Sequence, residues 1–238
     1  MSNIMQTSRT DFLDRIRVLL TALVILHHTA IMYGADGGWY LRYKADGLVS
    51  SLLLTLFCSV NQAFFMGMFF LLAGYFSTRS FESKGARQFL TDRLLRLGVP
   101  VLVFGFVLGP LTNALAETPA GETVRSFWWH LMSRLDFNIG PLWFAHALLI
   151  FSVAYMALRL LLPRLSWNLS PAVLNHAWVV FFLVTWGIAA FALRLWVPTG
   201  QERGLLQIGF FASYILLFFF GCAAAQARLL ENIDQKLA

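Results

Sequence analysis

The amino-acid sequence predicts an all-α fold, a polytopic bundle of about six transmembrane helices. Of its 238 residues, 58% are hydrophobic and only 13% are charged, whereas a soluble domain carries about 25% charged residues. The apolar residues gather in six runs, each long enough for the roughly 20 residues that a helix needs to cross a bilayer. The 23 Phe and 8 Trp agree, because aromatic rings are enriched at membrane interfaces. We therefore expect one integral-membrane domain over residues 1–238.

The runs predict helices over residues of about 16–34, 48–77, 97–116, 142–162, 174–197 and 205–227. We expect the first run to remain in the mature protein rather than to be a signal peptide, because His27 and His28 lie within it and no small-residue cleavage site follows. Turn-forming residues separate the runs, as at Gly37-Gly38, Pro119-Ala120-Gly121 and Pro198-Thr199-Gly200. The sequence shows no internal repeat and no soluble domain.

The Lys and Arg residues predict the orientation, because positive charge concentrates in cytoplasmic loops. With a cytoplasmic N-terminus, twelve of them lie inside: Arg9, Arg15, Arg17, Arg79, Lys84, Arg87, Arg93, Arg96, Arg159, Arg164, Arg228 and Lys236. Six lie outside: Arg42, Lys44, Arg125, Arg134, Arg194 and Arg203. We therefore expect a multi-pass cell-membrane protein with both termini cytoplasmic. Its net charge of +6 reflects this topology rather than a nucleic-acid partner.

Several kinds of site are excluded by their missing signatures. Cys58 and Cys222 both lie in apolar runs, which is typical of buried free thiols and not of a disulfide framework or a zinc site. We expect no metal. The sequence also lacks a Gly-x-Ser-x-Gly nucleophile elbow, a phosphate-binding Gly-x4-Gly-Lys loop and a His-Glu-x2-His motif.

Ionisable residues within the first predicted helix are candidates for function, because such residues are costly in a membrane. Arg17 and His28 are eleven positions apart, so they share a helix face about 16 Å apart along the axis. His27 points about 100° away from that face. The alternative is structural: Arg17 extends to lipid headgroups, and the histidines hydrogen-bond to neighbouring helices.

A second candidate site is the basic loop that we expect between the second and third predicted helices, with Arg79, Lys84, Arg87, Arg93 and Arg96. Arg93 and Arg96 are three positions apart, so on an α-helix their guanidinium groups converge on one anion. Arginine suits bidentate phosphate contacts, which indicates a phosphorylated cytoplasmic ligand. Taken alone, the cluster fits a contact with anionic membrane lipid better.

Five stretches stand in an order and spacing that are specific only in combination. They are Leu13-Asp14-Arg15-Ile16-Arg17 with His28 after ten residues, Gly37-Gly38-Trp39, Phe69 to Tyr75, Arg93-x-x-Arg96 with Pro100, and Gly140-Pro141-Leu142-Trp143-Phe144. In these the chain resembles the membrane acyltransferase-3 superfamily, which includes O-acetyltransferases of bacterial surface polysaccharides and a glucan-succinylating branch. The resemblance covers nearly the whole chain.

The resemblance implies an O-acyltransferase of the bacterial inner membrane that acts in polysaccharide modification. A cytoplasmic acyl-CoA, first of all acetyl-CoA, would be the co-substrate, with no permanently bound cofactor, and a carbohydrate hydroxyl would accept the acyl group. His28 and Arg17 are the implied catalytic residues, and Arg93, Arg96 and Arg87 the implied acyl-CoA contacts. His28 would serve either as a general base or as the acyl carrier.

The chain departs from the family pattern in two ways. Arg15 replaces a glycine in the stretch before Arg17, and six helices stand where family members usually have about ten. We therefore expect the N-terminal portion of such an enzyme, truncated at the C-terminus, with a partner as one source of the missing helices. The other hypotheses are a transporter-like bundle with His28 on a proton or substrate pathway, and a membrane bundle without catalysis.

Overall fold

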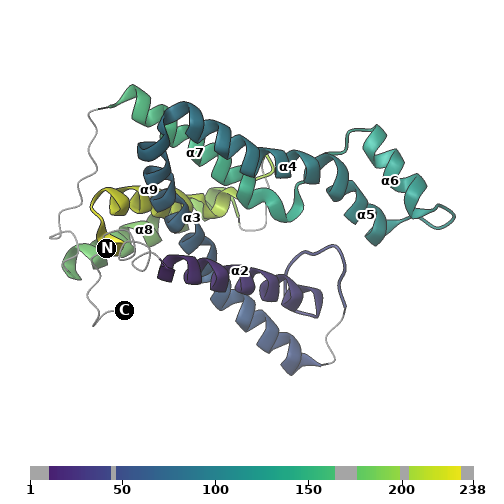
Figure 1. Cartoon of the computed structure of the whole chain (residues 1–238). Coiled ribbons are helices and arrows are strands. Elements are labelled where there is room, and N and C mark those ends of the chain that lie inside the picture. The colour runs from purple at the N-terminus through teal and green to yellow at the C-terminus, as the bar shows by residue number, and fades with distance from the viewer. Residues whose placement is uncertain (1–10, 44–46, 164–175, 199–203, 232–238) are drawn as a thin grey trace. The chain divides into compact units, whose positions relative to one another are not determined.

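The structure, a computed structural model, describes residues 11–43, 47–163, 176–198 and 204–231. Within these ranges the chain is almost entirely helical and contains no β-strand (Figure 1). Four helical segments of the described chain are long and apolar enough to cross a membrane: Phe12–Met32, Leu48–Glu117, Gly140–Leu161 and Ile208–Gln226. The predicted all-α transmembrane fold is thereby confirmed.

Four of the predicted helices agree with single elements to within a few residues. These are α2 (Asp11–Met32), α7 (Trp143–Leu161), α8 (His176–Trp196) and α9 (Phe211–Gln226). A short 3-10 turn, Ile208–Phe210, leads into α9. The termini, residues 1–10 and 232–238, lie outside the described residues, as does the predicted turn at Thr199-Gly200. The cytoplasmic position of both ends therefore stays a prediction.

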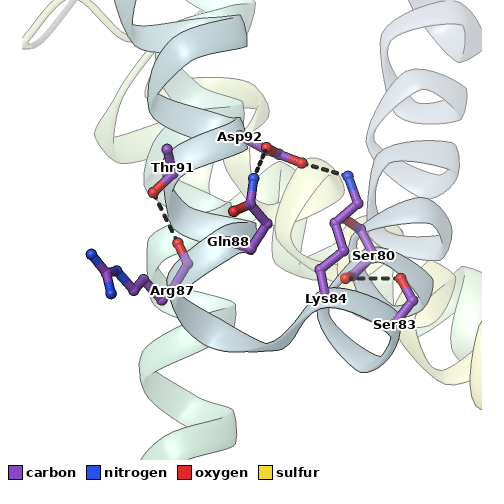
Figure 2. A network of polar contacts seen from close by, with 7 residues as sticks. All are labelled: Ser80, Ser83, Lys84, Arg87, Gln88, Thr91 and Asp92. Atoms are coloured by element: carbon purple, nitrogen blue, oxygen red, sulfur yellow. Dashed lines mark hydrogen bonds and ion pairs between the residues drawn. The ribbon is translucent and has the colours of Figure 1, made fainter.

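The stretch between the second and third predicted helices contains a helical hairpin that turns at Gly85, with one arm of α3 on either side of it. Helix α3 (Leu48–Arg93) is broken only there, where φ is 75° and ψ is 170°, a region that essentially glycine alone adopts. Figure 2 shows the two arms side by side at this turn, where Lys84 forms an ion pair with Asp92 across it. We expected a loop between the two apolar runs, and this prediction is wrong, because helix continues on both sides of Gly85. The basic residues of that stretch lie on helices.

Two π-helical turns interrupt the helix that follows the second arm. The order is Leu94–Gly98 (η1, π), Val99–Val103 (α4), Phe104–Leu108 (η2, π) and Gly109–Glu117 (α5). Pro100 and Pro110 come just after the π turns. A proline lacks the N–H that would bond the carbonyl four residues earlier, and its ring clashes with that carbonyl. The π turns absorb this mismatch and let the helix continue.

A short helix, α6 (Val124–Ser133), follows where we expected only a loop. It is too short to span a bilayer, so the search for long apolar runs missed it. Thr123 precedes the helix and forms a reciprocal capping box with Ser126, in which each side chain accepts from the other residue's backbone N–H. Such a box satisfies two of the amides that a helix N-terminus leaves unpaired.

The chain forms two compact units. Unit 1 contains residues 1–17, 66–93 and 147–238, and unit 2 contains residues 18–65 and 94–146. The single domain expected over residues 1–238 stays a prediction. The first unit contains the arginine contacts described below, and the second contains both histidines of α2.

Close helix contact holds unit 1 together, where α3 and α9 meet through glycines. A Cβ on Gly74 would collide with the carbonyl oxygen of Phe218, and one on Gly221 with that of Leu71. Small residues at such crossings let helix backbones approach, which is a common way to pack helices in membranes. Gly74 lies within the Phe69-to-Tyr75 motif, so this motif has a packing role.

In unit 2 the C-terminal half of α2 packs against the first arm of α3. The buried centre consists of Ala30, Ile31, Ala35 and Cys58, with Trp39, Leu54 and Phe57 around it. The loop after α2 is tied to the same arm by two hydrogen bonds. Ser51 donates to the carbonyl of Gly34 over 2.9 Å, and the amide of Asp36 donates to the Thr55 hydroxyl over 3.1 Å. The loop that carries Trp39 is thereby fixed.

Candidate active site

His28 lies near the end of α2, under the loop that follows it. Its imidazole stacks on the indole of Trp39, with ring centroids 4.1 Å apart and planes inclined by 21°. The neighbouring His27 is buried, stacks on Phe65 at 5.1 Å and meets His28 edge-on at 5.6 Å. The two imidazoles therefore lie among aromatic rings of unit 2. Because they occupy adjacent helix positions they point in different directions, His27 to Phe65 and His28 to Trp39.

Each imidazole has one ring nitrogen without a hydrogen-bond partner in the part of the chain that the structure describes. Nδ1 of His27 and Nδ1 of His28 are buried and make no hydrogen bond within the residues that the structure describes. Buried polar atoms are normally hydrogen-bonded, so each exception calls for an explanation. An imidazole nitrogen in this state can receive a hydrogen bond or a proton from a bound hydroxyl.

Tyr40 joins this aromatic group to the Gly140-Pro141 motif. The Tyr40 ring meets Trp39 edge-on at 5.4 Å. Its hydroxyl approaches Gly140 so closely that a Cβ on that glycine would collide with it. Gly140 also has a φ of +40°, which is costly for residues with a side chain, and its amide donates to the Asn138 side chain over 2.9 Å. Three distant sequence motifs thus meet in unit 2.

Arg17 lies on the same uninterrupted helix as His28, so the predicted spacing of about 16 Å along the axis holds. Its guanidinium donates to Asp14 over 3.2 Å and lies over the ring of Phe76 at 5.3 Å. The Arg17 and Asp14 side chains are 56% and 67% exposed, so this ion pair contributes little to stability. The contact with the Phe76 ring fixes the orientation of the Arg17 guanidinium.

Two further arginines contact the same turn of α3. Arg93 donates to the hydroxyl of Ser77 over 3.1 Å and lies 5.1 Å from the centre of the Phe89 ring. Arg79 donates to the Tyr75 hydroxyl over 3.4 Å. Three consecutive residues of α3 therefore contact one arginine each: Tyr75 contacts Arg79, Phe76 contacts Arg17 and Ser77 contacts Arg93. We call Arg17, Arg79 and Arg93 the arginine cluster of unit 1.

The other two predicted donor contacts, Arg96 and Arg87, are exposed. Arg96 belongs to the π-helical turn η1, where the α-helical argument from three-residue spacing does not apply. In Figure 2 the Arg87 side chain points away from the hydrogen bonds of Gln88 and Lys84 with Asp92. Convergence of Arg93 and Arg96 on one anion therefore stays a prediction, as does the role of Arg87.

The comparisons with known proteins give the family. The model of the acyltransferase domain family matches residues 10–237. The chain belongs to this family. Among the curated relatives that match it are proteins named glucans biosynthesis protein C, from Escherichia coli K12 and Salmonella gallinarum. The first is 29% identical over 57% of this chain and 37% of its own length, and the second is 27% identical over 78% and 49%.

This acyltransferase-family chain spans less than half the length of these two relatives. No solved structure matches it. The resemblance predicted from the sequence motifs is confirmed at the level of the family. The apolar helices and the family together indicate a membrane protein.

Two features of the site were missed by reasoning from the sequence. Trp39 was noticed only as part of a motif, although it contacts His28 directly. The contact of Tyr40 with Gly140 joins residues about 100 positions apart, which spacing alone cannot pair. The sequence does contain one signal for Trp39 and Tyr40. They belong to the Gly37-Gly38-Trp39-Tyr40 run, which follows the helix that contains the two histidines.

Proposed function

We propose that this chain forms the acyl-transfer centre of an inner-membrane enzyme that moves a short acyl group from acyl-CoA to a carbohydrate hydroxyl. Membership of the acyltransferase domain family supports the reaction class, and relatives named for glucan biosynthesis support a carbohydrate acceptor. The observation that carries the proposal is His28, which is stacked on Trp39 while its Nδ1 has no hydrogen bond within the described residues.

In the proposed reaction His28 takes the proton of the acceptor hydroxyl as the oxygen attacks the thioester carbonyl carbon. A new C–O bond forms, the C–S bond breaks, and coenzyme A leaves as a thiolate that recovers a proton from the imidazolium. The products are an ester and free coenzyme A, and no oxidant or metal takes part. Imidazole suits this task because it gains and loses a proton near neutral pH.

For the donor, we propose that its phosphate groups bind from the cytoplasmic side to Arg93, Arg96 and Arg87, with Arg17 as a further contact. The Arg93 guanidinium is held by Ser77 and Phe89, and such pre-orientation suits an arginine that receives a phosphate. Acetyl-CoA is the first donor to test. Both termini are proposed to be cytoplasmic, and a partner is the proposed source of any further helices that the reaction requires.

The test uses the chain in nanodiscs with acyl-CoA and a soluble glucan, and it compares His28→Ala with His27→Gln. Loss of a general base lowers the rate by about 10²- to 10⁴-fold, so His28→Ala should lose transfer but keep acyl-CoA affinity. His27→Gln should lose much less. Equal activity in His28→Ala and the unaltered chain would refute the proposal. Radiolabelled acyl-CoA without acceptor labels the protein only if His28 carries the acyl group.

A further inference from the structure

A cavity of about 520 Å³ opens beside helix α6 in unit 2. Side chains of two kinds line it, two tryptophans and three polar residues: Trp128, Trp129, Thr123, Arg125 and Ser126. Small-molecule sites combine aromatic surface with a few polar groups in this way. These residues belong neither to the His28 group nor to the arginine cluster of unit 1.

The two tryptophans have different roles in the cavity. Trp128 is fixed, because its indole N–H donates to the carbonyl of Val107 over 3.1 Å and so ties α6 to η2. Trp129 is free of such a tie within the described chain, and its side chain is 67% exposed. The first tryptophan therefore holds the cavity wall in place, and the second presents a flat apolar ring to whatever enters.

The polar side of the cavity is oriented by the start of the helix. The hydroxyls of Thr123 and Ser126 are held by their capping box. The Ser126 oxygen accepts two hydrogen bonds there, whereas the Thr123 oxygen accepts only one and keeps a second lone pair for a further donor. Arg125 is exposed and makes no hydrogen bond or ion pair within the described residues. The fixed Thr123 hydroxyl and an available guanidinium thus lie beside the exposed indole.

We propose that this cavity binds a sugar residue of the carbohydrate acceptor; this inference rests on the function proposed above. A pyranose has an apolar face of C–H groups and a rim of hydroxyls. The indole of Trp129 matches the face, and Arg125 with the Thr123 hydroxyl matches the rim. An apolar acyl chain would leave these polar groups without partners, which is unfavourable in a binding site.

The position of the cavity in the chain fits an acceptor site. Thr123 and Arg125 belong to the connection that the charge distribution places outside the membrane. A few residues after α6 the chain reaches Gly140, which touches Tyr40 and through it the His28–Trp39 stack. Sugar binding at α6 would therefore hold the acceptor on the part of the molecule that also contains the catalytic imidazole.

The test measures sugar binding alone, without acyl-CoA, by saturation-transfer NMR on the chain in nanodiscs. The ligands are β-1,2-, β-1,3- and β-1,4-linked glucose pentasaccharides, titrated separately, with empty nanodiscs as blank. At least one should bind, and Trp129→Ala should weaken it by about 10-fold, the effect of losing a stacked ring. Trp129→Phe should retain most of the affinity. Trp196→Ala, which removes another highly exposed tryptophan, should bind like the unaltered chain.

Absence of binding by all three sugars would overturn the inference, as would equal affinity in Trp129→Ala and the unaltered chain. Quenching of Trp129 by brominated lipids, together with such equal affinity, would make α6 a membrane-surface anchor instead. Failure of the proposed function has a different signature, in which the sugar binds through Trp129 but His28→Ala and the unaltered chain transfer acyl groups equally.

Discussion

The imidazole of His28 lies nearly parallel to the indole of Trp39, 4.1 Å from it between ring centres. The contact joins a transmembrane helix to the loop that follows it, and the bonds of Asp36 and Gly34 to α3 hold that loop in place. Stacking restricts rotation of the imidazole ring. Trp39 is therefore a positioning residue for His28 in the proposed reaction.

Trp39→Ala should lower kcat by about 10- to 100-fold, because a small misplacement of a catalytic group is enough for such a loss. The KM for acyl-CoA should stay nearly unchanged, and Trp39→Phe should recover most of the rate. Steady-state kinetics in nanodiscs provide both constants. A parallel loss of donor affinity, or no recovery by Phe, would indicate that Trp39 serves only to fold the loop.

Gly140→Ala should destabilise the protein by about 1–3 kcal/mol, because a Cβ combines a positive φ with a collision against the Tyr40 hydroxyl. Adding Tyr40→Phe should restore only part of the loss, since it removes the collision and leaves the backbone strain. Gly38→Ala is the control, as no atom lies within 4 Å of a Cβ there. Thermal unfolding in detergent measures all four proteins. Equal midpoints for the two alanine variants would contradict the argument.

Arg93→Lys should weaken acyl-CoA binding nearly as much as Arg93→Ala, because lysine cannot form a bidentate contact with phosphate. Binding should also weaken as salt rises and screens the charges. Isothermal titration calorimetry of acyl-CoA binding in nanodiscs measures both the effect of the substitutions and the effect of salt. Arg134→Lys, at an exposed arginine that is not part of the proposed donor site, should bind normally. If the double variant Arg93→Ala, Arg96→Ala binds acyl-CoA as tightly as the unaltered chain, these two arginines contact membrane lipid and not the donor.

Gly85→Ala and Gly187→Ala form a matched pair, because a Cβ meets no atom within 4 Å at either position. Gly85 has a φ of 75° and a ψ of 170°, so alanine there should cost about 1–3 kcal/mol. Gly187 lies inside α8 with ordinary helical backbone, so alanine there should stabilise by about 0.5–1 kcal/mol. Opposite shifts of the unfolding midpoint are expected. Shifts of the same sign would show that the hairpin turn of α3 does not require the backbone conformation that glycine allows at position 85.

Single cysteines at Ser80 and Glu122 should react from opposite sides of the membrane if the hairpin turn is cytoplasmic and the connection before α6 is outside. Cys58 and Cys222 are buried, so their background labelling with a membrane-impermeant maleimide should be low. Ser80→Cys should label only in inverted vesicles, and Glu122→Cys only in intact cells. Labelling of both in intact cells would refute the orientation.

The apolar runs predicted the transmembrane helices because hydrophobic length is a local property of the chain. They did not predict the π turns before Pro100 and Pro110, nor the hairpin at Gly85. These features depend on single glycine and proline residues that change the backbone locally, whereas the apolar pattern around them is that of a continuous helix. The short helix α6 was missed because it is amphipathic and shorter than a span.

For the site, helix geometry correctly gave the common α-helix of Arg17 and His28 and their spacing along it. The stack on Trp39 was beyond such reasoning, because it depends on a loop held by hydrogen bonds to another helix. The spacing of Arg93 from Arg96 predicts a shared anion. In the structure Arg93 also donates to Ser77, sixteen residues away across the hairpin, which only the turn at Gly85 brings near.

The glycine contact between α3 and α9 has a consequence for biogenesis. Gly74 and Cys222, which bond across it, are 148 residues apart in the chain. At a synthesis rate of about 5–20 residues per second, roughly 7–30 s pass between their emergence from the ribosome. During that interval α3 has no α9 to pack against at Gly74. A nascent chain halted before Gly221 would lack both glycine contacts that bring the two helices together.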